Sequence, residues 1–172
     1  MDLVPFLLQL HATTHAGEIS GSAAPERWLG GLSDDQLRRR PGEGLNSIVW
    51  LLWHMARTED VAVNLVVAGR AQVFDKEWAR RMNVPRPDMG TGMTADEVAV
   101  LSEHADVAAV RRYRSAVGAF GPNDYWVDGV GHRPWQGITR GHQLGQTAIR
   151  HNTAHMGEGI TLRSLGGFGL GV

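Results

Sequence analysis

Two histidines near the C-terminus, His151 and His155, have the spacing of metal ligands on one helix. Residues four apart on a helix share a face with Cβ atoms ~5–6 Å apart, so both imidazoles can reach one cation at ~2.0–2.1 Å. Ala148 and Gly159 fall on the same stripe and are small, which predicts an inward face with space beside the histidines. On spacing alone, a polar pair that is hydrogen-bonded or exposed explains them as well.

A second pair at the same spacing, His11 and His15, lies near the N-terminus. The chain has eight histidines, so such a pair arises readily by chance and the motif is weak by itself. We interpret His11 and His15 as a polar helical pair that is hydrogen-bonded or exposed.

A third ligand is available in the most apolar stretch, "VWLLWHMARTED", where His54 shares a helical face with Trp50 and Thr58. A lone buried histidine is commonly a satisfied core residue. However, burying three imidazoles from two helices is costly unless they share a cation that accepts their lone pairs. Three neutral ligands would leave coordination positions open, as in catalytic sites. Imidazole suits Zn, Ni and Fe alike, so one divalent transition metal is expected at His54, His151 and His155.

One acid lies on the face of this expected site. Glu158, three residues after His155, could orient a ligand, transfer a proton as a catalytic group, or simply be solvated. Asp60 lies about 120° around its helix from His54 and is a poor ligand candidate. Three further histidines are expected at the surface or beside the site: His104, His132 and His142.

The composition excludes several classes of function. The 172 residues suit one domain over 1–172, and the net charge of −1 with only a short basic run at 38–40 argues against nucleic-acid binding. There is no cysteine, which excludes disulfides, a thiolate nucleophile and cysteine metal sites. The N-terminus lacks signal-peptide features and no apolar stretch is long enough for a membrane, so we expect a cytoplasmic protein. Arginine supplies sixteen of the seventeen basic residues, which suggests a high-GC bacterial source.

The elements that must position these residues are helical. Periodicity and capping signals predict four long helices, over about 3–19, 47–69, 94–120 and 142–165. The stretch "DKEWARR" could form a short extra helix, and "NDYWVDGVGHRPWQGIT" is expected as loop. This pattern predicts an all-α fold, a four-helix bundle with long loops and at least one crossover connection.

The combination of "NSIVWLLWHMARTED" with "HNTAHMGEGITLR", in this order and separation, resembles the DinB-like (DinB/YfiT) superfamily. The resemblance covers most of the chain. It implies a bundle with a crossover, often a homodimer, and a three-histidine divalent-metal site at His54, His151 and His155. Family members with known activity are largely S-transferases and isomerases that use a low-molecular-weight thiol such as bacillithiol, mycothiol or glutathione.

Two related patterns fit less well. A branch that forms part of the sulfoxide synthases resembles His-x-x-x-His-x-Glu, whereas Glu158 comes three residues after His155. Asn152 stands where a zincin would carry its glutamate base.

We therefore expect a metal-dependent enzyme that acts on a small molecule, with a mycothiol-type S-transferase or isomerase as the first hypothesis. A non-catalytic metal- or ligand-binding bundle and a metal-dependent hydrolase remain alternatives. Trp50 and Trp135 are candidates for the pocket wall.

Overall fold

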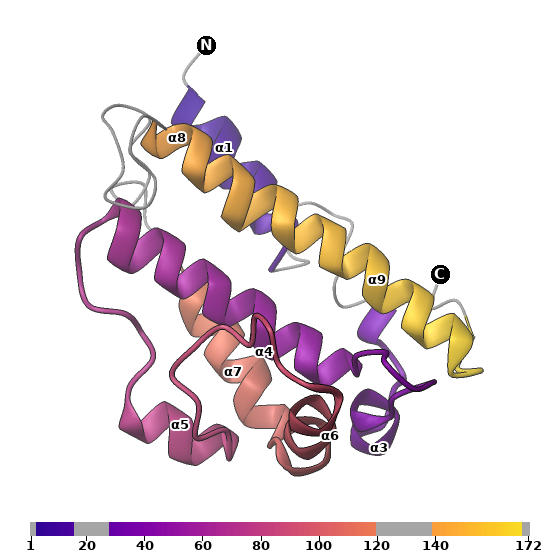
Figure 1. The fold of residues 1–172 in the computed structure, drawn as a ribbon. Helices are drawn as coiled ribbons and strands as arrows, with labels where there is room; N and C mark the ends of the chain where they lie inside the picture. Colours follow the sequence, from indigo (N-terminus) through magenta and orange to yellow (C-terminus); the bar gives the residue numbers. More distant parts are fainter. Residues whose placement is uncertain (1–2, 16–27, 120–138, 170–172) are drawn as a thin grey trace.

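The computed structural model describes residues 3–15, 28–119 and 139–169, and within these ranges the chain is an all-α bundle without β-strands (Figure 1). The predicted fold class is confirmed. In chain order the helices are α1 (Leu3–Ala12), α3 (Asp34–Arg38), α4 (Ile48–Asp60), the π-helical η1 (Val61–Val67), α5 (Lys76–Met82), α6 (Ala95–His104), α7 (Val107–Gly118), α8 (Arg140–Leu144), the π-helical η3 (Gly145–His151) and α9 (Asn152–Leu165).

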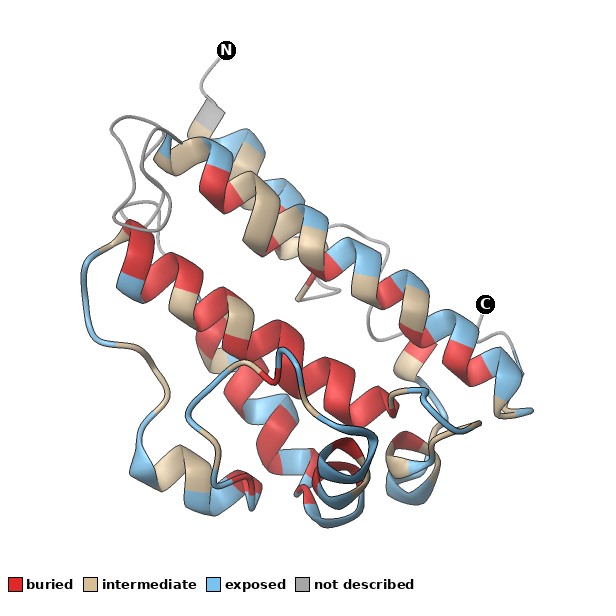
Figure 2. Cartoon of the chain, in the orientation of Figure 1, coloured by how far each residue is buried: buried red, intermediate tan, exposed pale blue. Residues whose placement is uncertain are grey.

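Helix α4 and its continuation η1 form the centre of the bundle. Almost every residue of α4 is buried, as its red colour in Figure 2 shows. Its first half is apolar on all sides, and the charged residues of its second half are paired inside the bundle. The Ser47 side chain accepts a hydrogen bond from the Trp50 backbone N–H and caps the first turn. At the other end the helix stops at Ala68, and Gly69 takes a left-handed φ of +64°. The predicted bounds of 47–69 are confirmed.

The third predicted helix is wrong as one continuous element, since it is broken into α6 and α7. Ala105 is extended, and the Asp106 side chain accepts a hydrogen bond from the Ala109 N–H, which starts a new helix. The Asp106 N–H donates instead to the Met82 carbonyl. The predicted capping box at Thr94, which begins α6, is present.

Helices α4 and α7 run in the same direction, so the chain between them must return along the bundle. Ser47 at the start of α4 is hydrogen-bonded to Ser102 of α6, at 2.7 Å, while Tyr113 of α7 contacts Arg57 further along α4. The connection over residues 68–94 is therefore the predicted crossover. Its middle part forms α5, the short helix expected in "DKEWARR".

The crossover is held against α4 by two buried charges. The Arg57 guanidinium donates to the Pro87 carbonyl at 2.5 Å and lies 4.1 Å from the Phe74 ring centroid. The Asp60 carboxylate accepts hydrogen bonds from the backbone N–H groups of Val73 and Phe74, at 2.9 and 2.8 Å. These contacts fix the backbone of the crossover to α4 at Val73 and Phe74 and again at Pro87.

The last helix, formed by α8, η3 and α9, runs antiparallel to α4 and η1 (Figure 1). Thr139 caps it, three residues before the predicted start at 142. Its first part packs on η1 and on α1 through a small apolar cluster of Val63, Val67, Leu144 and Ala148.

The predicted length of the first helix, 3–19, is wrong: α1 ends at Ala12, and residues 13–15 form a turn in which the Thr14 and His15 N–H groups donate to the carbonyls three residues before them. Residues 16–19 and the predicted loop at 120–138 lie outside the described ranges. The basic run at 38–40 begins at the end of α3, where the Arg38 guanidinium donates to the Ala105 carbonyl. No helix of the described part is both long and apolar enough to span a membrane.

Candidate metal centre

The three histidines chosen from the sequence come together between the central and the last helix. His54 comes from α4, His151 is the final residue of η3, and His155 lies one turn further on α9. The Nε2 atoms of His54 and His151 are 3.3 Å apart, and one ring nitrogen from each of the three lies within 4.8 Å of the others. This spacing is what a single cation with three imidazole ligands requires.

Two of the rings are oriented by acceptors on their outer side. The Nδ1–H of His54 donates to the Met89 carbonyl at 2.5 Å, and the Nδ1–H of His155 donates to the Glu158 carboxylate at 2.8 Å. An imidazole that donates through Nδ1 carries its lone pair on Nε2. Histidines bound to metals are typically held by such a carbonyl or carboxylate. The donor set therefore fits a metal ion.

Burial keeps the rings of His54 and His151 in the neutral form that binds metals. Burial, and then the neighbouring rings of His155 and His54, lowers the pKa of His151 to about 4. Burial also lowers the pKa of His54, although the bond to Met89 opposes the shift. At neutral pH both rings present a lone pair without first losing a proton.

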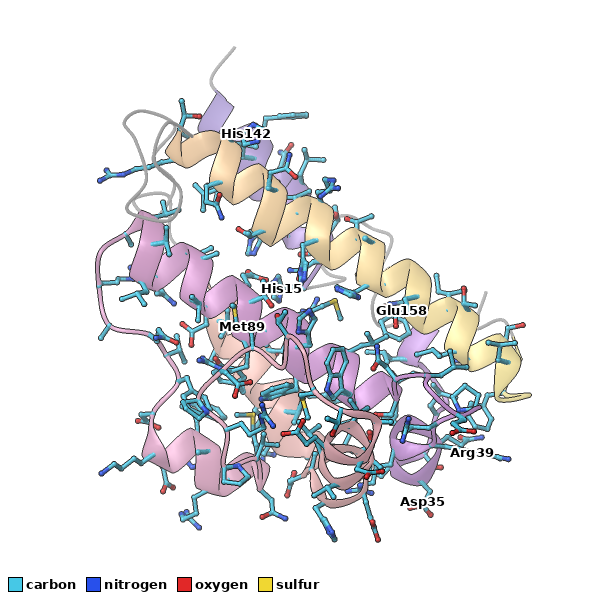
Figure 3. The ribbon with its side chains drawn as sticks, in the orientation of Figure 1. His15, Asp35, Arg39, Met89, His142 and Glu158 are labelled. Atoms are coloured by element: carbon cyan, nitrogen blue, oxygen red, sulfur yellow. The ribbon has the colours of Figure 1, made fainter. Side chains whose placement is uncertain are left out.

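Glu158, labelled on the last helix in Figure 3, is half-buried and contacts His155. Its carboxylate accepts hydrogen bonds from His155 and from the Asn46 amide, the latter at 3.0 Å. The bond from His155 lowers the pKa of the Glu158 carboxyl despite its partial burial. Of the three roles considered for Glu158, orientation of His155 is the one that these contacts support.

One wall of the centre is aromatic. The indole of Trp50 stacks on the His54 ring, with centroids 4.7 Å apart and an interplanar angle of 11°. Its Nε1–H donates to the Met93 sulfur at 3.3 Å. The other proposed wall residue, Trp135, lies outside the described residues.

The space predicted beside the histidines at Gly159 is filled. A Cβ atom at Gly159 would lie 2.5 Å from the Trp28 indole, so this glycine accommodates a core aromatic ring. Ala148 is fully buried in the apolar cluster between η1 and η3. The prediction of an inward face is correct, but the prediction of empty space is wrong.

The other histidines separate into two groups. His104 and His142 are exposed, as expected, and His132 lies outside the described residues. His11 is buried, His15 is partly buried, and both contact the Glu59 carboxylate of α4, so of the two expected states the hydrogen-bonded one is correct and the exposed one is wrong. Glu59 was not foreseen; its signal is a charged residue within the most apolar helix of the chain.

Comparison with known proteins agrees with this architecture. A search of curated proteins gave no significant match. Among solved structures, a conserved protein from Enterococcus faecalis is similar with a TM-score of 0.68 at 18% identity, over 98% of this chain and 99% of that chain. At this identity the likeness concerns the fold alone. The family model of the DinB superfamily matches residues 23–158, which include all three histidines of the centre. The chain belongs to the DinB superfamily.

Proposed function

We propose that the protein is a divalent-metal-dependent enzyme in which His54, His151 and His155 hold one metal ion. The observation that carries this proposal is the pair of Nε2 atoms that face each other at 3.3 Å. Two imidazoles so placed repel unless a proton or a cation lies between their lone pairs. Because its pKa is lowered to about 4, His151 is neutral at neutral pH, and its single ring proton can lie on Nδ1 when a cation binds Nε2.

A divalent cation held by three neutral ligands keeps coordination positions open and lowers the pKa of a thiol or water that binds there. The chain's own contribution is orientation and shielding. The Met89 carbonyl and the Glu158 carboxylate fix two of the rings, and Trp50 covers one face of His54.

We infer a thiol-dependent transferase or isomerase, with mycothiol as the first thiol to test. This follows from the superfamily and from the composition that suggests a high-GC bacterium. Since the chain has no cysteine, the nucleophilic sulfur would have to come from a bound small molecule. The electrophile would be a second small molecule near the centre.

Metal analysis tests the first part of the proposal. We expect protein purified without chelator to contain a transition metal, and the His54→Ala variant to lose it from this centre. His104→Ala is a matched control, because His104 is exposed and remote from the other rings. Wild-type and His54→Ala proteins with equal metal content at this centre would refute the assignment.

Cobalt substitution tests the thiol. We expect mycothiol to add a sulfur-to-cobalt charge-transfer band to the Co(II) protein and to support turnover of a generic electrophile such as a halogenated dinitrobenzene. A Co(II) spectrum unchanged by mycothiol, bacillithiol and glutathione would contradict the transferase. Ester cleavage without thiol would instead identify a hydrolase, and metal without turnover would identify a binding protein.

A homodimer is a separate expectation from the resemblance. Sedimentation velocity should give the mass of two chains, and a single-chain mass across micromolar concentrations would contradict it.

A further inference from the structure

A second group of metal-ligand side chains lies deeper in the bundle, where α1 meets α4. The Nε2 of His11 is 2.6 Å from Glu59 Oε1, and the Nε2 of His15 is 2.9 Å from Glu59 Oε2. One ligand atom from each residue lies within 4.8 Å of the other two. His11 and Glu59 are 3% and 0% exposed, so the group is more buried than the three-histidine centre.

The chemistry of this group is that of a metal site. Two imidazoles from a His-x-x-x-His sequence and one carboxylate from another helix are the donors of the His₂Glu zinc sites and of the two-histidine, one-carboxylate iron sites. We propose that His11, His15 and Glu59 bind a second divalent transition metal, separate from the ion expected at His54. This site has one anionic ligand, whereas the first has none.

The present contacts need little change to admit an ion. Ligand atoms at ~2.0–2.1 Å from a common cation lie roughly 3 Å apart, close to the 2.6 and 2.9 Å seen here. A cation would take the place of the Nε2 protons that now point at the carboxylate, and each neutral imidazole would then carry its single proton on Nδ1. Burial lowers the pKa of His15 and so favours its neutral ring, while Glu59 stays ionised through its contacts with both histidines.

Surrounding side chains already hold the three ligands in position. The Asn152 amide donates to Glu59, and the Arg114 guanidinium donates to the Thr14 carbonyl beside His15. Gly118 faces the His15 ring so closely that a Cβ atom there would lie 2.4 Å from Nδ1. A rigid, prearranged donor set lowers the cost of binding an ion.

Space for a further ligand adjoins the group. A cavity of about 400 Å³ is lined by His15, Arg114, Arg111 and Ser115, among others. With two arginines on its wall, this cavity favours an anion, such as hydroxide or a small carboxylate, as the fourth ligand. That anion would also offset the charge of Arg114 near the bound cation.

Metal stoichiometry decides between a metal site and a cluster held by hydrogen bonds alone. The metal-free protein would be loaded with Zn(II), freed of excess ion and analysed by mass spectrometry. We expect two equivalents in wild type, one in the His151→Ala/His155→Ala variant and one in Glu59→Gln. Glu59→Gln keeps the shape and an acceptor oxygen, and the double variant leaves the second site untouched, so neither result depends on a damaged core.

Two outcomes overturn the proposal: no zinc in the His151→Ala/His155→Ala protein with native circular dichroism, or full wild-type zinc in Glu59→Gln. The same measurement distinguishes failure of this proposal from failure of the three-histidine centre. If wild-type protein binds one equivalent of zinc, loses it in Glu59→Gln and keeps it in the double variant, the second site is supported and the three-histidine centre is refuted. Visible d–d bands of Co(II) in the double variant give an independent readout of nitrogen and oxygen ligation.

Discussion

The two histidine clusters use the same short motif in opposite surroundings. His151 and His155 are partly exposed and share their group with His54, and two of the three rings are oriented from outside by a backbone carbonyl and by Glu158. His11 and His15 surround a fully buried carboxylate that they contact directly. The first arrangement brings ring nitrogens together without an acid between them, while the second places a carboxylate between its two rings. The comparison teaches that spacing on a helix identifies ligands but does not decide what they bind.

The largest difference should appear when the acid of each cluster is removed. Glu59→Ala removes the buried carboxylate that two histidines and the Asn152 amide share, and we expect it to lower the free energy of unfolding of the metal-free protein by about 3–5 kcal/mol. Glu158→Ala, at a half-exposed site, should cost about 1 kcal/mol or less. Urea denaturation of both variants measures the difference. Equal costs would show that burial does not distinguish the clusters.

A smaller effect should follow from crowding the second cluster alone. Gly118→Ala places a methyl group against the His15 ring, and we expect a loss of about 1–3 kcal/mol in stability from overpacking. Metal binding at His54, His151 and His155 should not change. Gly157→Ala is the control, because its Cβ would meet open space in α9. Weaker zinc binding at the three-histidine centre in Gly118→Ala would show that the clusters are mechanically coupled.

Loss of the Glu158 carboxylate should weaken zinc binding at the three-histidine centre more than it lowers the stability of the fold. Replacing the carboxylate by an amide weakens the hold on His155, and we expect Glu158→Gln to bind Zn(II) about 10–100-fold more weakly at the three-histidine centre. Competition with a chromogenic chelator measures this. Glu103→Gln, at an exposed residue remote from the rings, is the matched control. If both variants bind zinc like wild type, Glu158 does not orient His155.

The smallest effect concerns pH. The pKa of His151 is lowered to about 4 in the folded protein, so between the ordinary histidine pKa near 6.5 and pH 4 the unfolded chain binds more protons than the folded one. This contribution to stability is present above pH 6.5 and is lost as the pH falls to 4. We expect the Tm of metal-free wild type to fall over this range, and to fall less in His151→Asn. Identical pH profiles would contradict the assignment.

The sequence was sufficient for the central and the last helix and for the meeting of the three rings of the first cluster. Caps at Ser47 and Thr94 and the inward face of His54 follow from local patterns, because helix periodicity is a property of neighbouring residues. The break at Asp106 was missed, although an aspartate before a helical run is itself a capping signal.

Contacts between distant helices could not be predicted in the same way. Glu59 lies about 140° around α4 from His54, and only the placement of α1 decides that this face contacts His11. The Met89 carbonyl has no sequence signature, since every residue carries one. The extent to which 1–172 is one domain, and its location in the cell, remain predictions.

The crossover has a consequence for how the protein can be altered. The acceptor that holds His54 is the backbone oxygen of Met89, so a different side chain at 89 leaves that bond available. A change of length beside Met89 does not, because a residue inserted or deleted between Met89 and the anchor at Pro87 would carry the carbonyl away from the ring. The three-histidine centre should therefore tolerate many substitutions in this connection and few insertions, which makes loop length, rather than loop composition, the variable that engineering must keep fixed.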